Sequence, residues 1–200
     1  MIDRFYPVVP SAEWVARLVP AGARFIQLRI KEQPEAELRR QAREAQAICA
    51  KHGAQLIVND YWRIAIDEKC PWVHLGQEDL VDADVGAIRR AGLLLGVSTH
   101  DHAELDKGLS VDPDYVALGP IYPTLLKKMP FAPQGLDRIG EWKRLVGKKP
   151  LVAIGGLTLE RALLCLEAGA DSAAVVGDIV NNADPVVQAQ KWIAETRRAA

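Results

Sequence analysis

Basic and amide side chains alternate along the run Gln27-Leu28-Arg29-Ile30-Lys31. In an extended segment every second side chain points to the same side, so Gln27, Arg29 and Lys31 share one face. The Arg29 guanidinium is a planar fork that fits phosphate oxygens, and the Lys31 ammonium is a compact positive charge. The run therefore predicts an anion-binding face. The alternative is a pair of solvated charges at the end of a strand.

Two carboxylates follow neighbouring apolar runs of the chain. Asp60 comes directly after Ile57-Val58-Asn59, and Asp79 lies shortly beyond Leu75. Carboxylates at adjacent strand ends could hold one Mg2+, which prefers oxygen ligands and shares them with waters and substrate phosphates. Asp60 could instead cap a helix beginning near Tyr61, because Asp is a favoured N-cap residue. The spacing leaves both interpretations open.

Smaller polar residues stand near the ends of the same runs. Gly76 permits close approach of the backbone to a ligand, whereas His74 fits either a binding pocket or a hydrogen-bonded position in the core. Thr99 or Asp101 is expected to cap the helix that follows. Ser98 is then expected to face the site.

A long loop and two glycine-containing turns supply further candidate contacts. The segment 119–135 contains Lys127, a cation that could close over a phosphate, and long loops often bind ligands. Gly155-Gly156 and Val176-Gly177 each follow an apolar run, and backbone N–H groups in such turns can bind phosphate, although Gly-Gly is also an ordinary tight turn. The sequence thus predicts two anion sites, one cationic and one built from backbone, which suits two phosphorylated substrates.

Eight short apolar runs must position these residues. They are Phe5–Val9, Arg24–Ile30, Gln55–Val58, Trp72–Leu75, Leu93–Val97, Tyr115–Leu118, Leu151–Ile154 and Ser172–Val176. Stretches with apolar residues at helical spacing separate most of them, which predicts parallel strands joined by crossover helices. Eight such units favour an α/β fold with a single (β/α)8 TIM barrel over residues 1–200, whose site lies where the strands end. A doubly wound sheet is the alternative, but no GxGxxG follows the first strand.

The composition is that of an ordinary globular protein, with 49% hydrophobic and 26% charged residues. A formal net charge of −1 gives no general attraction to nucleic acid or to an anionic membrane. The N-terminal residues lack the layout of a signal peptide and no apolar run is long enough to span a membrane, so we expect a cytoplasmic location. Cys49, Cys70 and Cys165 form no CxxC pair, which predicts reduced, buried thiols. The oligomeric state stays open.

Several motifs together resemble the thiamine-phosphate synthase family. They are QLRIK, IVNDYW, VHLGQEDL, GVSTH, GPIYPT, APQG, VAIGG and AGADSAAVV, and they follow in order over nearly the whole chain. The resemblance implies a transferase of thiamine biosynthesis that joins hydroxymethylpyrimidine pyrophosphate to hydroxyethylthiazole phosphate with the help of Mg2+. The products would be thiamine phosphate and pyrophosphate. The partners that the resemblance implies are these small molecules.

The resemblance also assigns roles to the candidate residues. Gln27, His74 and Gly76 would contact the aminopyrimidine, and Asp60 with Asp79 would hold Mg2+. The pyrophosphate would lie among Arg29, Lys31, Asn59, Ser98 and Lys127. Of these, catalysis is assigned to Arg29, Lys31, Ser98 and Lys127. The thiazole phosphate would lie against Thr124, Gly156, Val176 and Gly177.

The family reaction is dissociative: pyrophosphate leaves, the electron-rich pyrimidine stabilises the remaining cation, and the thiazole nitrogen attacks it. Positive charges around the leaving group supply electrostatic catalysis, so no side-chain nucleophile is required.

Two positions depart from the family pattern. Leu126 stands where many members have Thr, and Gly177 stands where many have Ser. We expect retained activity with weaker binding of the thiazole phosphate, since each change removes a hydroxyl group. The alternative functions are a TenI-like thiazole tautomerase and a non-catalytic regulatory module that binds thiamine precursors.

Overall fold

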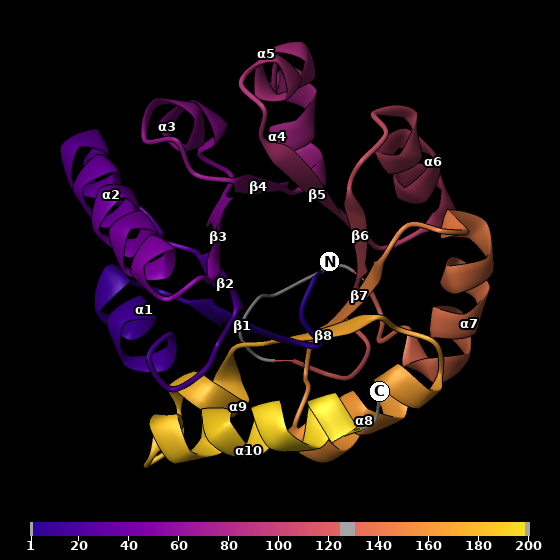
Figure 1. Ribbon diagram of the computed structural model, residues 1–200. Helices are drawn as coiled ribbons and strands as arrows, with labels where there is room; N and C mark the ends of the chain where they lie inside the picture. The colour runs from indigo at the N-terminus through magenta and orange to yellow at the C-terminus, as the bar shows by residue number, and fades with distance from the viewer. Residues whose placement is uncertain (1, 125–130, 199–200) are drawn as a thin grey trace.

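The chain forms a ring of parallel strands with helices on its outside (Figure 1). A computed structural model describes residues 2–124 and 131–198, and within these ranges eight strands close into a barrel in sequence order. The strands are β1 (Phe5–Val9), β2 (Phe25–Leu28), β3 (Gln55–Asn59), β4 (Trp72–Leu75), β5 (Leu94–Thr99), β6 (Tyr115–Leu118), β7 (Leu151–Ile154) and β8 (Ser172–Val175). Neighbouring strands are parallel throughout, and β8 pairs with β1. The predicted TIM barrel is confirmed, and the doubly wound alternative is wrong.

Helices join successive strands, as parallel neighbours require, and α9 and α10 follow the last strand. They are α1 (Ala12–Leu18), α2 (Glu35–Lys51), α3 (Trp62–Asp67), α4 (Gln77–Asp82), α5 (Val85–Arg90), α6 (His102–Ser110), α7 (Gly135–Val146), α8 (Leu159–Glu167), α9 (Gly177–Val180) and α10 (Pro185–Arg198). No helix in the described part of the chain has both the length and the apolar character needed to cross a membrane.

The second strand is shorter than predicted. β2 ends at Leu28 rather than Ile30, although the N–H of Arg29 still donates to the carbonyl of Val9 at 2.8 Å. β1 ends at Val9, so the chain beyond Arg29 has no partner on that side. Arg29 and Lys31 therefore lie past the barrel wall, on the segment that leaves its end.

The fifth strand is longer than predicted and continues to Thr99. The Thr99 hydroxyl donates to the carbonyl of Ala117 at 2.9 Å and accepts the indole N–H of Trp142 at 3.0 Å. These buried bonds make Thr99 a wall residue, so the prediction that it could cap a helix is wrong. Asp101 caps α6 with its side chain, and Ser98 belongs to the strand itself.

Side chains along the strands alternate between two apolar cores. Those that point outward pack beneath the helices, and those that point inward fill the barrel. The inner core consists of Ile2, Tyr6, Val8, Phe25, Ile57, Trp72, Tyr115, Ala117, Val152 and Ala174. Its aromatic rings contact one another with centroids 4.6 to 6.0 Å apart. The barrel interior is therefore packed, and ligands can reach the site only from the mouth where the strands end.

The three cysteines are buried and form no disulfide. Cys49 lies in α2, Cys165 lies in α8, and Cys70 immediately precedes the segment leading into β4. Burial raises the pKa of each thiol to about 12. The prediction of reduced, buried thiols is confirmed.

Candidate active site

Polar side chains occupy the last inward-facing positions of neighbouring strands. Gln27 of β2, Asn59 of β3 and His74 of β4 are only 4%, 6% and 7% exposed. Ser98 of β5 is half-buried. Because side chains two residues apart share a face, each of these residues continues the inward-facing row of its strand. The structure therefore brings these four predicted residues to one half of the barrel mouth.

The predicted cationic face runs from the barrel interior towards solvent. Gln27 is buried, Arg29 is half-buried and Lys31 is exposed. Burial is the largest cause of the pKa shifts of Asp60 and His74, and the positive charge of Arg29 acts in addition to lower both pKa values. The Arg29 guanidinium therefore lies beside the polar end of the barrel. Arg29 therefore belongs to the site in the structure, whereas Lys31 stands at its exposed rim.

Asp60 and Asp79 contact each other beyond the ends of β3 and β4. The pKa of Asp60 is raised to about 6, first by burial and then by the charge of Asp79 and a hydrogen bond to it. Arg29 and the backbone N–H of Gly76 oppose this shift by stabilising the carboxylate. The pair thus concentrates negative charge that its neighbours only partly neutralise.

The backbone conformation of Asp60 directs its carboxylate towards Asp79. Its φ of 64° lies in the left-handed region, which Asp tolerates better than most residues. Its N–H donates to the carbonyl of His74 at 2.8 Å, and the side-chain amide of Asn59 donates to its carboxylate. The N-cap position of α3 belongs to Tyr61, which makes no side-chain cap bond. The alternative that Asp60 caps α3 is therefore wrong.

The two carboxylates have the donor chemistry that suits Mg2+. Among the described residues no group of three or more His, Cys, Asp or Glu could hold a metal, so the chain would supply these two ligands. Mg2+ usually takes one or two carboxylates and completes its shell with waters and substrate phosphates. A Cβ at Gly76 would lie 3.1 Å from Oδ2 of Asp79, so this glycine leaves space beside the carboxylate. Asp60 and Asp79 fit the expected ion.

A chain of buried hydrogen bonds crosses the inside of the barrel. The Gln27 amide donates to the hydroxyl of Tyr6 at 2.7 Å, and the hydroxyls of Tyr6 and Tyr115 are 2.8 Å apart. Nδ1 of His74 lies 2.8 Å from the Tyr115 hydroxyl. Nε2 of His74 lies 2.8 Å from Oγ of Ser98. Two predicted site residues, Gln27 and Ser98, are thereby linked through the core.

His74 is a buried, neutral histidine. Its pKa is lowered to about 3, chiefly because burial disfavours the charged ring and also because Arg29 is nearby. His74 therefore has the environment of a hydrogen-bonded core residue, which is one of the two predicted alternatives. One of its ring nitrogens nevertheless contacts Ser98 at the barrel mouth. The sequence does not single out Tyr6 and Tyr115, because an aromatic residue within an apolar strand is typical of a core. Their inward register is the signal that could have identified them.

The Gly155-Gly156 turn is shaped by close packing. Both residues have left-handed φ values, 102° and 64°. A Cβ at Gly155 would lie 2.6 Å from Cα of Pro120, and a Cβ at Gly156 would lie 2.4 Å from the carbonyl oxygen of Pro123. The segment that follows β6 packs so closely that neither position has room for a Cβ. Packing in a tight turn is therefore enough to explain why both residues are glycine. Contact of Gly156 with a phosphate stays a prediction.

Arg161 of α8 holds the same turn from the other side. Its guanidinium donates to the carbonyl of Gly156 at 2.7 Å and lies 4.6 Å from the ring centroid of Tyr122. One side chain thus connects the segments after β6 and β7. The sequence does not identify Arg161, because a basic residue on an amphipathic helix usually faces solvent.

Three further candidates follow the ends of β6 and β8, in the other half of the mouth. Val176 is the N-cap residue of α9, and Gly177 is the first residue of that helix. Thr124 is half-buried in the segment after β6. Lys127 and Leu126 lie outside the described residues.

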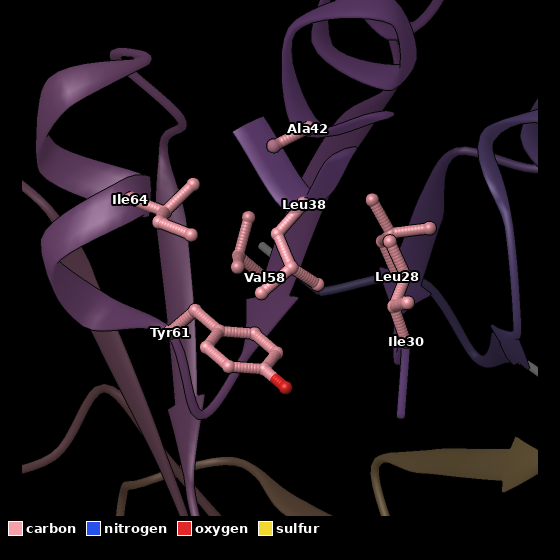
Figure 2. A pocket seen from close by; sticks show the side chains of 7 residues that line it. All are labelled: Leu28, Ile30, Leu38, Ala42, Val58, Tyr61 and Ile64. Atoms are coloured by element: carbon pink, nitrogen blue, oxygen red, sulfur yellow. The ribbon is translucent and has the colours of Figure 1, made fainter. Parts of the chain in front are cut away.

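A separate recess between α2 and α3 is apolar (Figure 2). Its lining consists of Leu28, Ile30, Leu38, Ala42, Val58, Tyr61 and Ile64. The Tyr61 hydroxyl is the one polar side-chain group in this lining, and it points away from the neighbouring aliphatic side chains. The recess offers no charge to a phosphate, so the polar barrel mouth is the better candidate for the site.

Comparison with known proteins shows which family the chain belongs to. The model of the family described as thiamine monophosphate synthase matches residues 5–179. A thiamine-phosphate synthase from Rhizobium etli is 60% identical over 195 residues, which cover 98% of this chain and 96% of that protein. One from Cronobacter sakazakii is 51% identical over 193 residues, which cover 96% of this chain and 89% of that protein.

A solved structure supports the fold independently. The thiamine phosphate pyrophosphorylase from Pyrococcus furiosus matches with a TM-score of 0.87 over 98% of this chain and 96% of that one. Its sequence identity of 23% makes this a likeness of fold alone. The family match extends over most of the chain, and more than half of the aligned residues are identical in relatives of similar length. The chain therefore belongs to the thiamine monophosphate synthase family.

Proposed function

We propose that this chain joins hydroxymethylpyrimidine pyrophosphate to hydroxyethylthiazole phosphate, giving thiamine phosphate and pyrophosphate. As a member of its family the chain is an enzyme, a transferase that makes thiamine phosphate. The observation that carries the detailed proposal is the Asp60–Asp79 carboxylate pair beside Arg29 at the barrel mouth. Such a pair, next to a guanidinium, suits a pyrophosphate that arrives with Mg2+. A cytoplasmic location stays a prediction.

Asp60 and Asp79 would hold the ion. When bound, Mg2+ supplies positive charge that stabilises the negative charge developing on the departing pyrophosphate. Arg29 and Lys31 add fixed positive charge to the same group, and Lys127 is assigned to it by family resemblance. Electrostatic stabilisation of this kind acts on the transition state and needs no side-chain nucleophile.

The buried amide and hydroxyl groups would orient the pyrimidine and its leaving group. Gln27 is fixed by its bond to Tyr6, and Ser98 is fixed by its bond to His74. A pyrimidine held between them would share the barrel mouth with the thiazole phosphate expected at the glycine turns. Holding both reactants in one mouth removes much of the entropic barrier to their encounter. The packed aromatic core below keeps water from reaching the reacting carbon from inside the barrel.

The reaction itself tests the proposal. Purified protein is incubated with both substrates, with and without Mg2+, and thiamine phosphate and pyrophosphate are measured. We expect both products in equal amounts, and a large loss of rate when the metal is chelated. No product under saturating conditions would exclude the synthase reaction. Isomerisation of the thiazole compound without coupling would instead indicate a tautomerase, and binding without any turnover would indicate a regulatory module.

A further inference from the structure

The Gln27 amide gives the hydrogen-bond chain inside the barrel a preferred direction. Nε2 of Gln27 can only donate, and it donates to the hydroxyl of Tyr6. The single proton of Tyr6 then goes to the hydroxyl of Tyr115, its other neighbour in the chain. Tyr115 in turn donates to Nδ1 of His74, which therefore carries no proton. A neutral His74 has its proton on Nε2 and donates it to Oγ of Ser98.

The opposite direction would leave a buried proton without an acceptor. If His74 donated from Nδ1, Tyr115 would donate to Tyr6. Tyr6 would then receive two donors, and no hydrogen bond among the described residues offers an acceptor for its own proton. An unpaired buried donor disfavours this arrangement by on the order of tenfold or more.

Burial keeps every member of the chain in its neutral form. Tyr6 is 1% exposed and Tyr115 is 0% exposed, and burial raises the pKa of both phenols. Because both phenols stay protonated, each has one proton to donate. Water has little access to the chain, so its direction is set by the protein groups alone.

Gly96 allows Tyr115 to reach His74 across an intervening strand. The strand register places Gly96 of β5 between His74 of β4 and Tyr115 of β6. A Cβ at Gly96 would lie 2.0 Å from Cζ and 2.4 Å from the hydroxyl oxygen of Tyr115. The Tyr115 ring therefore occupies the space that a side chain would fill. It lies nearly parallel to the imidazole of His74, with centroids 5.6 Å apart and an interplanar angle of 13°.

We propose that Tyr115 is a positioning residue that fixes the tautomer of His74. Oγ of Ser98 accepts from His74, so its own proton is directed into the barrel mouth, towards an oxygen of a phosphoanion. A phosphoanion can only accept in this contact, so a hydroxyl locked as a donor favours it. The functional part of this inference rests on the proposed function, in which Ser98 contacts the pyrophosphate.

Nitrogen NMR of the ligand-free protein tests the tautomer without any activity. The chain has four histidines, and the signal of His74 is assigned by its loss in His74→Gln. In the wild-type protein we expect a protonated Nε2 and a bare Nδ1. Tyr115→Phe should mix or invert the tautomers, because Nδ1 then loses its donor. Tyr6→Phe should preserve the tautomer, since Tyr115 can still donate to His74, and it is the matched control.

Steady-state kinetics test the consequence for the substrate. Tyr115→Phe keeps the packed ring, and we expect kcat/KM for the pyrimidine pyrophosphate to fall on the order of tenfold. The KM for the thiazole phosphate should stay the same, which general damage to the barrel would not achieve. Ser98→Ala should cause a similar loss. The double variant Tyr115→Phe/Ser98→Ala should be no worse than the poorer single variant, because both changes remove one shared interaction.

The outcomes separate this inference from the proposed function. A wild-type His74 protonated at Nδ1, or additive losses in the double variant, would overturn the inference while leaving an active synthase. An active Ser98→Ala variant with unchanged kinetics would overturn it as well. Failure of the wild-type protein to make thiamine phosphate would overturn the proposed function. If Tyr115→Phe did not fold, the wild-type tautomer and its retention in Tyr6→Phe would still decide the question.

Discussion

At the barrel mouth, the half formed by β2–β5 presents side chains, whereas the half formed by β6–β8 presents backbone. In the first half, buried groups such as Gln27, His74 and Asp60 are each held by a neighbouring side chain or charge. In the second half, Gly155 and Gly156 shape the turn because another segment packs against them. We therefore expect the first half to recognise its ligand by charge and proton position, and the second by shape. Changes of charge at constant size should damage the first half, and changes of size should damage the second.

The largest effect is expected from Asp79→Asn, which changes charge at nearly constant size. We expect turnover to fall on the order of 100-fold or more, because the change removes one of the two carboxylates proposed to hold the Mg2+ that stabilises the departing pyrophosphate. The melting temperature should change little. Exposed Glu78 provides the matched control, and Glu78→Gln should retain activity. Unchanged turnover and metal dependence in Asp79→Asn would contradict the proposed Mg2+ site.

The second effect tests shape in the other half. Gly156→Ala places a Cβ 2.4 Å from the carbonyl oxygen of Pro123 at a φ of 64°, so the segment after β6 must shift. We expect the KM for the thiazole phosphate to rise on the order of tenfold, with little change in the KM for the pyrimidine pyrophosphate.

Gly53→Ala is the control for the strain of the backbone in Gly156→Ala. Gly53 has the same φ of 64° but nothing within 4 Å of its added Cβ. Left-handed strain alone should destabilise this variant by about 1–2 kcal/mol, and substrate KM values should not change. An equal rise in KM in both variants would show that packing at Gly156 is not what matters.

The third effect is a pH-dependent change in stability at Asp60. Its pKa of about 6 is above the ordinary value for Asp, so the folded state binds the proton more tightly than the unfolded state does. This contribution to stability is complete below the ordinary pKa and is lost as the pH rises through about 6. Asp60→Asn should therefore stabilise the metal-free protein at pH 8 by on the order of 1–2 kcal/mol, and hardly at pH 4.

Urea unfolding of wild-type protein and Asp60→Asn at both pH values, with a chelator present, measures this difference. Addition of Mg2+ should then stabilise the wild-type protein more than the variant, because the ion binds the folded carboxylate pair. A variant that is less stable than the wild-type protein at pH 8 without metal would show that Asp60 carries no excess of negative charge.

The smallest effect is expected at Gly177, the first residue of α9. Gly177→Ser adds the hydroxyl that the family resemblance leads us to expect here, and a neutral hydrogen bond contributes about 0.5–1.5 kcal/mol. The affinity for thiazole phosphate, measured by calorimetry, should therefore rise about 2- to 10-fold. An affinity equal to that of the wild-type protein would show that the missing hydroxyl is not a ligand contact.

The barrel could be predicted from the sequence because its apolar runs are short and separated by helical stretches. The end of β5 could not, since Thr99 has the polarity of a cap and becomes a wall residue only through its bonds to Ala117 and Trp142. Likewise, the sequence identifies Asp60 as a candidate ligand, but only its left-handed backbone excludes the helix-cap alternative.

The candidate site was partly predictable for a related reason. Charged and amide groups such as Arg29 and Gln27 are unusual at strand ends, so their types reveal them. Tyr115 and Arg161 have ordinary types for their elements, a core aromatic residue and a helix cation, and only their partners across the fold give them a role. Contacts between distant segments do not leave a local pattern in the sequence.

Gly96 and Tyr115 are coupled by packing, so the residue type at one position limits the residue type at the other. A larger residue at Gly96 is compatible only with a smaller residue at Tyr115, because the two would otherwise overlap at 2.0 Å. A smaller residue at Tyr115 would also remove the hydroxyl that meets His74. A change that makes room for a side chain at position 96 therefore also alters the donor that meets His74, and a library that varies position 96 alone should recover glycine.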